Sequence, residues 1–303
     1  MLFISDDQVG QSITMRDAVA AMRALFEDLG RHAGVIQERV RVHDAGVSLS
    51  MMGGIHTSAG VMGAKVYPTV KGQFNFIIPL FSCDDGRLLC TVAGNALTRL
   101  RTAAVTRVAA DCLRPGPGRR VAVYGSGVQA EAHVEAFALD GYAAEFRLCS
   151  RGDAKALAEQ WQQRYGVPVT CADAADAAAW ADVIITATRA AEPLFDGKLP
   201  RPGTLVAAIG SSKPVTREVD DEVLRRASMI VVEAAGQAAR EGGELVMAGP
   251  DTGVRDKLVE LGALLPRADT ARAAGDLLVY KSVGIGLEDV ALANHIYQRV
   301  AAA

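Results

Sequence analysis

Hydrophobic and polar residues alternate in two different ways along the chain. In the first 70 residues, a segment with helical spacing, RDAVAAMRALFEDLGRHAG, is followed by alternating, strand-like stretches such as RVRVHDAGVSLSMM. Two more strands are expected in QFNFIIPLFSCDDGRLLCTVAG, joined at the strong turn signal Asp84-Asp85-Gly86. The pattern predicts an α+β domain here rather than the start of a doubly wound sheet.

A long helix is expected next, from about Thr98 to Leu113, and the sequence RPGPG ends it because prolines and glycines interrupt helices. This cluster is the predicted domain boundary. From Arg119 onwards, short apolar strands alternate with helical segments as far as SMIVVE, which predicts a parallel sheet covered by helices on both faces. The C-terminal stretch VYKSVGIGLEDVALANHIYQRVAAA predicts a helix after a glycine turn.

The first strand of this second region leads into a glycine turn and then a helix, in VAVYGSGVQAEAHVEAF. Gly125 allows a tight turn, and Gly127 lets the backbone approach a pyrophosphate at the helix N-terminus. Ala130, at the third position, is small enough for the helix to pack closely on the strand. A plain strand-to-helix turn is the alternative, but the flanking elements favour a dinucleotide site.

The end of the next strand bears on which dinucleotide is bound. A chain that binds NAD usually has an acidic residue there, which bonds the ribose hydroxyls. This sequence instead has Ser150 and Arg151, and an arginine would pair with a 2′-phosphate. We therefore expect NADP(H) to be preferred, with NAD(H) possible. The alternative is that Arg151 is only a solvated turn residue.

Basic residues occur upstream in stretches that are otherwise mostly small or apolar. Lys65 lies in VMGAKVYPTV, Arg101 lies in ALTRLRTAAVTRVAA, and Arg39 and Arg41 fall on the same face of an expected strand. Two arginines can clamp a carboxylate, and a lysine beside them can have its pKa lowered enough to exchange a proton. Taken singly, each cation is explained as well by pairing with an acid or by reaching solvent. Together with a nucleotide domain, they predict a hydride-transfer site.

Composition narrows the remaining possibilities. The chain has 303 residues, half of them apolar, which is enough for two domains. Its net charge of −3 is too balanced for nucleic acid or a membrane surface to be the main partner. The five cysteines are scattered, without spacing that suggests a metal site. There is no signal-peptide pattern or long apolar run, so we expect a soluble, cytoplasmic protein.

The sequence resembles the ornithine cyclodeaminase and mu-crystallin family over nearly its whole length. Its motifs occur in order as GAKVYPT, ALTRLRTAAVTRVAA, VYGSGVQAEAHVEAF, DVIITATRAAEPLF and SVGIGLEDVALA. The resemblance implies a homodimer that acts on a small α-imino or α-amino acid by moving a hydride between a nicotinamide and the substrate α-carbon. The implied fold class is α/β: a Rossmann-type dinucleotide-binding domain at residues 116–275, and a smaller α+β substrate-binding and dimerisation domain from residues 1–115 and 276–303.

The resemblance also assigns residues. It implies that Arg101 binds the substrate carboxylate and that Lys65 is the acid or base near the substrate nitrogen, with Arg39 as the second carboxylate ligand and Arg41 as its rival. The residues expected to hold the cofactor are Gly125, Gly127, Val128, Gln129 and Ala130 at the pyrophosphate, Ser150 and Arg151 at the adenosine ribose or its phosphate, Thr186 and Thr188 after a later strand, and Val283 and Gly284 over the nicotinamide.

One departure from the family pattern affects the expected reaction. Cyclodeaminases have an aspartate in the loop after the VAAIG strand, where this chain has Ser212, and a serine cannot act as that base without help. The nearest acids, Glu218, Asp220 and Asp221, look like the start of a helix.

We therefore expect reduction of a cyclic ketimine carboxylate, either Δ1-pyrroline-2-carboxylate or Δ1-piperideine-2-carboxylate, to L-proline or L-pipecolate. The alternatives are an ornithine cyclodeaminase that forms proline and ammonia, and an alanine or N-alkyl amino-acid dehydrogenase. A non-enzymatic alternative is a nucleotide-dependent protein that binds a small ligand.

Overall fold

The computed structural model describes residues 2–267 and 276–302, which form two compact units. The first unit consists of residues 1–105 and 284–303, and the second of residues 106–283. The division falls inside a helix, before the RPGPG cluster that the sequence suggested as the boundary. The C-terminal junction also differs from the expected residue 276, because the apolar segment before residue 284 forms a strand of the second unit.

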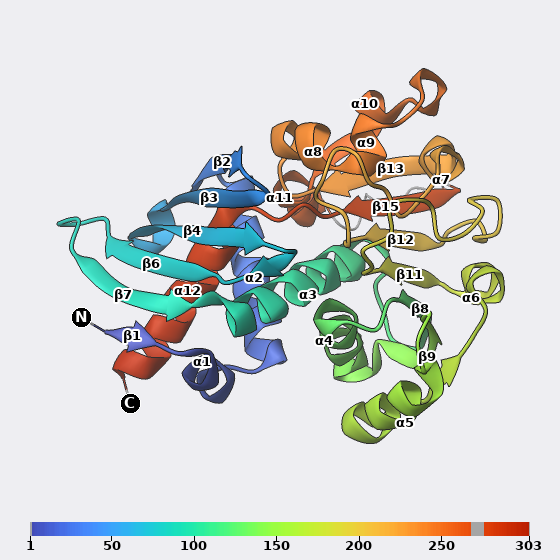
Figure 1. The fold of residues 1–303 in the computed structure, drawn as a ribbon, viewed down its shortest axis with the longest axis horizontal. Helices are drawn as coiled ribbons and strands as arrows, with labels where there is room; N and C mark the ends of the chain where they lie inside the picture. Colours follow the sequence, from blue (N-terminus) through green and yellow to red (C-terminus); the bar gives the residue numbers. More distant parts are fainter. Residues whose placement is uncertain (1, 268–275, 303) are drawn as a thin grey trace. The chain divides into compact units, whose positions relative to one another are not determined.

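The first unit is built on a mostly antiparallel sheet with the strand order β1-β7-β6-β4-β3-β2 (Figure 1). The short strand β5 pairs with β4. Its strands are β1 (Phe3–Ile4), β2 (Val35–Asp44), β3 (Val47–His56), β4 (Val61–Val70), β5 (Gln73–Phe74), β6 (Ile77–Ser82) and β7 (Leu88–Ala93). Strands β6 and β7 form the hairpin that Asp84-Asp85-Gly86 predicted. The α+β character expected from the sequence is confirmed.

Helices cover one face of this sheet. They are α1 (Asp6–Ser12), α2 (Met15–Gly30) and α12 (Gly286–Ala301), while α3 (Gly94–Leu113) runs from this unit into the next. Helix α12 packs across β3 and β4 and against α2 (Figure 1). Along β3, Ser50 and Met52 are buried while Leu49 and Met51 are exposed, as expected for a strand with one covered face. The sheet therefore has one covered face and one open, apolar face.

The second unit contains an entirely parallel sheet with the strand order β10-β9-β8-β11-β12-β15-β13-β14. The strands are β8 (Arg119–Tyr124), β9 (Ala143–Cys149), β10 (Val169–Cys171), β11 (Val183–Thr186), β12 (Leu205–Ala208), β13 (Ala227–Val232), β14 (Leu258–Glu260) and β15 (Leu277–Lys281). The chain order reverses between β8 and β11, which is where ligands bind in sheets of this type. The predicted α/β class is confirmed.

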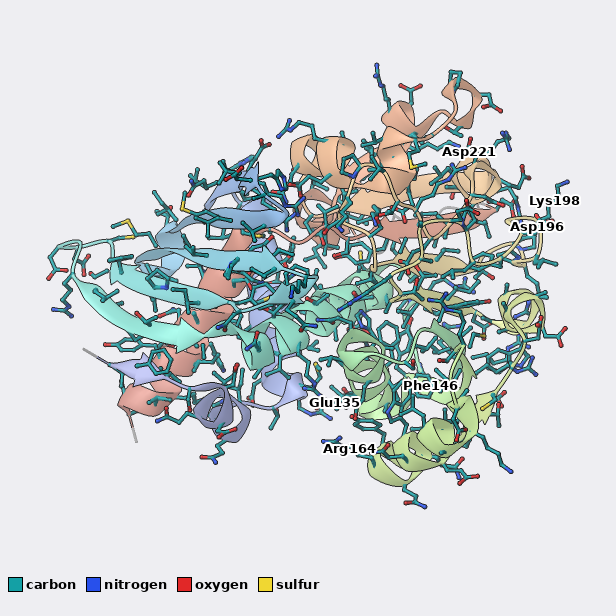
Figure 2. All side chains as sticks on the ribbon, viewed as in Figure 1. Glu135, Phe146, Arg164, Asp196, Lys198 and Asp221 are labelled. Carbon is teal, nitrogen blue, oxygen red and sulfur yellow. The ribbon has the colours of Figure 1, made fainter. Side chains whose placement is uncertain are left out.

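Helices accompany this sheet, which is why its central strands are apolar throughout. They are α4 (Val128–Ala138), α5 (Ala154–Tyr165), α6 (Ala174–Trp180), α7 (Asp221–Arg226), α8 (Ala235–Glu241), α9 (Gly243–Val246), α10 (Val254–Lys257) and α11 (Leu261–Leu264). Helices α4 and α5 pack together beside β9, where Phe146 is buried and Arg164 of α5 pairs with Glu131 of α4 at 2.8 Å (Figure 2). Among the described residues, no helix is long and apolar enough to cross a membrane.

Candidate active site

Lys65 projects from β4 into the interior of the first unit and is 1% exposed. Its Nζ donates hydrogen bonds to Thr98 Oγ1 at 2.7 Å and to Asp289 Oδ1 at 3.1 Å. The same atom lies over the ring of Phe76, 4.1 Å from the centroid. A buried ammonium needs such partners, because transfer out of water costs several kcal/mol when a charge is left uncompensated.

Arg101 on α3 is held by the first turn of α12. Its Nη1 donates to Glu288 Oε2 at 2.7 Å, and its Nε lies 3.4 Å from Asp289 Oδ1. Both carboxylates are fully buried. The acidic side chains also suit the first turn of a helix, where the dipole favours negative charge. Helix α12 therefore supplies counter-ions for both Lys65 and Arg101.

Arg39 belongs to the same part of the first unit. On β2, its Nη2 donates to the carbonyl oxygen of Gly284 at 3.3 Å, and its Nε lies 3.2 Å from Met52 Sδ. Gly284 has a φ of +71°, and a Cβ there would lie 2.5 Å from Arg101 Nη1. Glycine is thus required both for the backbone conformation and for the close approach of Arg101.

Burial lowers the pKa of Lys65 to about 7, an effect that Asp289 opposes and that the nearby Arg101 and Arg39 reinforce. The Lys65 ammonium can consequently lose and regain a proton near neutral pH, as a general acid or base requires. Asp289 pairs with both Lys65 and Arg101, and Glu288 pairs with Arg101. Guanidinium groups such as those of Arg101 and Arg39 are suited to binding a carboxylate through paired hydrogen bonds.

The glycine turn between β8 and α4 has the form that the sequence predicted. Gly125 has a φ of +120°, and a Cβ there would lie 2.5 Å from the Ala187 carbonyl oxygen. Gly127 is the N-cap of α4, and no heavy atom lies within 4 Å of a Cβ built on it. Ala130 is fully buried, and Val128 is 65% exposed.

The open space over Gly127 and the N-terminus of α4 that follows it fit a dinucleotide pyrophosphate, because a helix N-terminus favours negative charge. Gln129 lies in that first turn. Ser150 and the exposed Arg151 directly follow β9, at the carboxyl edge of the sheet. These positions suit the adenosine end of a dinucleotide.

Thr186 and Thr188, at the end of β11, direct their hydroxyl groups to Glu218. Thr186 Oγ1 donates to Glu218 Oε2 at 2.8 Å, and Thr188 donates to Oε1 through both its Oγ1, at 2.6 Å, and its backbone N–H, at 2.7 Å. The backbone N–H of Gly210 donates to Oε2 at 2.7 Å. Burial raises the pKa of Glu218, and the hydrogen bonds from Thr188 and the charge of Lys281 oppose that effect.

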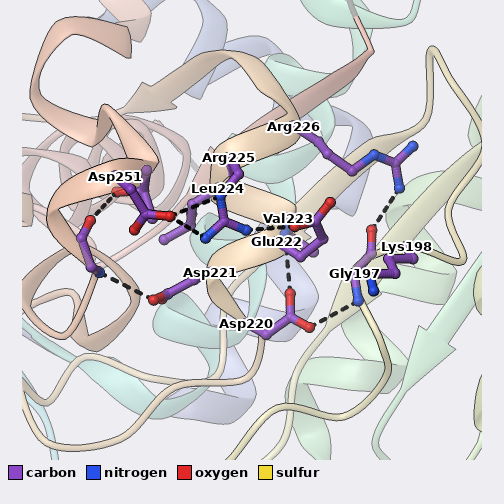
Figure 3. Close-up of polar contacts among 12 residues, drawn as sticks. Gly197, Lys198, Asp220, Asp221, Glu222, Val223, Leu224, Arg225, Arg226 and Asp251 are labelled. Atoms are coloured by element: carbon purple, nitrogen blue, oxygen red, sulfur yellow. Dashed lines mark hydrogen bonds and ion pairs between the residues drawn. The ribbon is translucent and has the colours of Figure 1, made fainter.

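The interpretation of Glu218 as the start of a helix is therefore wrong. Helix α7 begins at Asp221, and its N-cap is Asp220, whose side chain accepts from the Val223 N–H at 3.0 Å and the Gly197 N–H at 2.9 Å (Figure 3). Asp221 pairs with Arg217 at 2.6 Å. Only Asp220 and Asp221 have the helix-start role expected of the three acids.

Val283, the last residue of the second unit, is buried, and its N–H donates to Glu233 Oε2 at 3.2 Å. Glu233 Oε1 also accepts from the hydroxyl groups of Tyr280 and Ser282, at 2.8 and 2.6 Å. The segment that follows β15 is thus fixed by a buried carboxylate.

Sequence reasoning missed three residues that organise these sites, Thr98, Glu288 and Asp289, and it assigned the wrong role to a fourth, Glu218. Glu288 and Asp289 carried a signal, because two adjacent acids interrupt the otherwise apolar stretch GLEDVALA. Charged residues in an apolar stretch are also the signal that singles out Lys65 and Arg101. Thr98 and Glu218 have no comparable signal, since hydroxyl and acidic residues are common near helix starts.

The chain is similar in sequence to proteins of one known family. The model of the ornithine cyclodeaminase/mu-crystallin family matches residues 8–303. The ketimine reductase mu-crystallin of Mus musculus is 32% identical over 257 residues, covering 82% of this chain and 79% of that protein. A Delta(1)-pyrroline-2-carboxylate reductase of Bacillus cereus is 26% identical over 319 residues, covering 99% and 96%.

A solved structure is similar over the entire chain. It is described as a "probable ornithine cyclodeaminase" from Bordetella pertussis Tohama I, and it superposes with a TM-score of 0.96 at 45% identity, covering 100% of this chain and 97% of that one. The resemblance read from the motifs is confirmed: the chain belongs to the ornithine cyclodeaminase/mu-crystallin family.

Proposed function

We propose that this protein is an NAD(P)H-dependent reductase of a cyclic ketimine carboxylate, converting Δ1-pyrroline-2-carboxylate or Δ1-piperideine-2-carboxylate to L-proline or L-pipecolate. The observation that carries the proposal is Lys65, a buried amine with a pKa lowered to about 7, held by Asp289 beside Arg101. The names of two relatives, a ketimine reductase and a pyrroline-2-carboxylate reductase, support imine reduction.

In this proposal, the two arginines bind the substrate and the lysine transfers a proton. Arg101, with Arg39, pairs with the substrate carboxylate through charge-assisted hydrogen bonds and so fixes the orientation of the imine. Lys65, or a water it holds, keeps the imine nitrogen protonated, which makes the adjacent carbon electrophilic. A bound nicotinamide dinucleotide would supply the hydride.

The cofactor is proposed to be NADP(H) in preference to NAD(H). Gly125, Gly127 and the first turn of α4 would hold the pyrophosphate, because their backbone can approach it closely. Arg151, exposed after β9, would pair with the 2′-phosphate, and no acidic residue stands beside it in the LCSRG stretch to repel that group.

The second candidate is ornithine cyclodeaminase, favoured by the 45% identical structure from Bordetella pertussis that bears this name. That reaction needs an acid to replace the aspartate missing at Ser212. The three acids nearest to Ser212 along the chain have other partners: Glu218 accepts from Thr186, Thr188 and Gly210, Asp220 caps α7, and Asp221 pairs with Arg217. This occupation supports reduction over cyclodeamination.

A homodimer is proposed through the open face of the first unit's sheet. Paired positions on that face, Val40 with Met51 and Val42 with Leu49, are 39–60% exposed. A contiguous apolar patch of this kind marks an association surface, and a two-fold axis lets the same patch cover itself. Light scattering should give about twice the 31.9 kDa chain mass, and V42E combined with L49E should give the monomer mass.

Purified protein should be mixed with enzymatically generated Δ1-pyrroline-2-carboxylate, and the consumption of NADPH and NADH followed separately. Ornithine with NAD⁺ should be run in parallel, with an ammonia assay. Rapid NADPH loss without ammonia from ornithine is the expected result. Ammonia and proline from ornithine, without net change in the cofactor, would identify a cyclodeaminase instead. Absence of turnover on every imino or amino acid would leave only a binding role.

A further inference from the structure

The carboxylate of Glu218 joins the loops that follow two neighbouring parallel strands. Thr186 and Thr188 belong to the end of β11, and Gly210 follows β12. These four residues are named the Glu218 cluster. A Cβ at Gly210 would collide with the Thr188 carbonyl oxygen and lie 2.5 Å from Glu218 Oε1. The two loops are therefore packed around Glu218 too closely for any other residue at position 210.

A second buried layer supports the cluster. The backbone N–H of Glu218 donates to Glu244 Oε1 at 3.0 Å, and Glu244 Oε2 lies 2.8 Å from Lys281 Nζ. Lys281, at the end of β15, also donates to the carbonyl oxygen of Ser211 at 2.6 Å. Glu218, Glu244 and Lys281 are each at most 1% exposed. The ends of β11, β12 and β15 are thus connected through three buried ionisable side chains.

The geometry gives Glu218 an accepting role. Each of its oxygens receives two donors, and one donor to each oxygen is a backbone N–H, from Thr188 or Gly210, which cannot reverse its direction. Four converging donors match a carboxylate that only accepts. A glutamine would turn its own NH₂ group towards one of these N–H groups, so it is not an equivalent replacement.

The position of the cluster in the sheet indicates which part of the cofactor depends on it. The pyrophosphate turn follows β8, and the adenosine end of a dinucleotide extends over β9 on one side. The nicotinamide half would then extend to the other side of the switch point, towards the ends of β11 and β12. Those are the two strand ends that Glu218 joins.

We propose that Glu218 is a positioning residue for the nicotinamide half of the dinucleotide, acting through Thr188 and Gly210. The inference rests on the proposed function only for the identity of the cofactor. The sequence predicts a direct cofactor contact for Thr186, but this residue is fully buried and its hydroxyl group donates to Glu218, so the proposal gives Thr186 an indirect role. Removing that hydroxyl therefore tests positioning without deleting a cofactor contact.

The test is calorimetric titration of the full-length protein with two ligands, NADP⁺ and 2′-phospho-ADP-ribose, which lacks the nicotinamide. The variants are T186V and E218Q. The matched control is T204V, which removes another buried hydroxyl, bonded to the Ala181 carbonyl oxygen at 3.2 Å, just before the opposite end of β12. Thermal unfolding of each variant verifies that it is folded.

Affinity for NADP⁺ should fall by about tenfold in T186V, and by more in E218Q, because a hydrogen bond to a charged group is lost or reversed. Affinity for 2′-phospho-ADP-ribose should stay within about twofold, and T204V should alter neither. If E218Q does not fold, the affinities of T186V for the two ligands decide whether the proposal holds.

Equal weakening of both ligands, or unchanged binding of both, would overturn the proposal. If the unmodified protein binds both ligands but reduces no imine, the proposed function fails and the positioning role can still be measured.

Discussion

Asp289 Oδ1 lies 3.1 Å from Lys65 Nζ and 3.4 Å from Arg101 Nε, so one carboxylate oxygen contacts both cations. All three side chains are buried, and Asp289 is fully so. The shared counter-ion fixes the distance between the group proposed to protonate the imine and the group proposed to bind the carboxylate. It also opposes the lowering of the Lys65 pKa by burial.

Replacing Asp289 with asparagine should shift the activity profile to lower pH. D289N removes the negative charge that favours the Lys65 ammonium, so the pKa of Lys65 should fall below about 7. The measurement is kcat/KM for the imine as a function of pH. E288Q is the control, because Glu288 pairs with Arg101 and its loss should mainly raise KM. An unchanged pH profile in D289N would contradict this role.

For the unmodified protein, kcat/KM should fall as the pH rises through about 7, because the protonated form of Lys65 is the one that acts. The profile should be followed from acidic to alkaline pH with the cofactor saturating. In K65M, the rate should be lower by about 100-fold or more, and this limb should be absent. If the fall in kcat/KM near pH 7 persists in K65M, a group other than Lys65 causes it.

The same buried amine should affect stability with a defined sign. The pKa of Lys65 is about 7 in the folded protein and about 10.5 when unperturbed, so between these values the unfolded chain binds the additional proton. The contribution of Lys65 to the free energy of unfolding should therefore increase as pH rises through this window. This contribution is measured by urea unfolding of the unmodified protein and of K65M at several pH values. The stability of K65M relative to the unmodified protein should increase as pH falls, and become constant below about pH 7.

The two arginines of β2 can be separated by matched substitutions. Arg39 donates to the Gly284 carbonyl oxygen and influences the pKa of Lys65, whereas Arg41 pairs in register with Ser50 further along the strand. R39M should raise the KM of the imine by about tenfold to 100-fold through the loss of a charge-assisted contact. R41M should leave KM within about twofold. The opposite pattern would make Arg41 the carboxylate ligand.

Local patterns in the sequence predicted the elements and the individual cations well. The turn at Gly125 and Gly127 stands between a buried strand and a helix, as expected from its flanking residues. Lys65 and Arg101 are buried, as their apolar surroundings suggested. These features depend on residues close in sequence, where the periodicity of strands and helices is informative.

The partners of those cations were not predictable in the same way. Asp289 is 224 residues from Lys65, and only the packing of α12 on β4 brings the two together. Glu218 was misinterpreted because EVDDEVL has the composition of a helix start. Its burial results from the approach of the β11 and β12 loops, which no local pattern encodes.

Arg151 is expected to determine the preference for NADPH over NADH. R151E places a carboxylate where a 2′-phosphate would lie, so the KM for NADPH should rise by at least about tenfold through the loss of a pairing cation and the added repulsion. The KM for NADH, which has no such phosphate, should change little. K155E makes the same charge change at an exposed position on α5 nearby. Equal effects of R151E and K155E would indicate general electrostatic repulsion, whereas a selective loss of NADPH in R151E would assign the phosphate contact to this arginine.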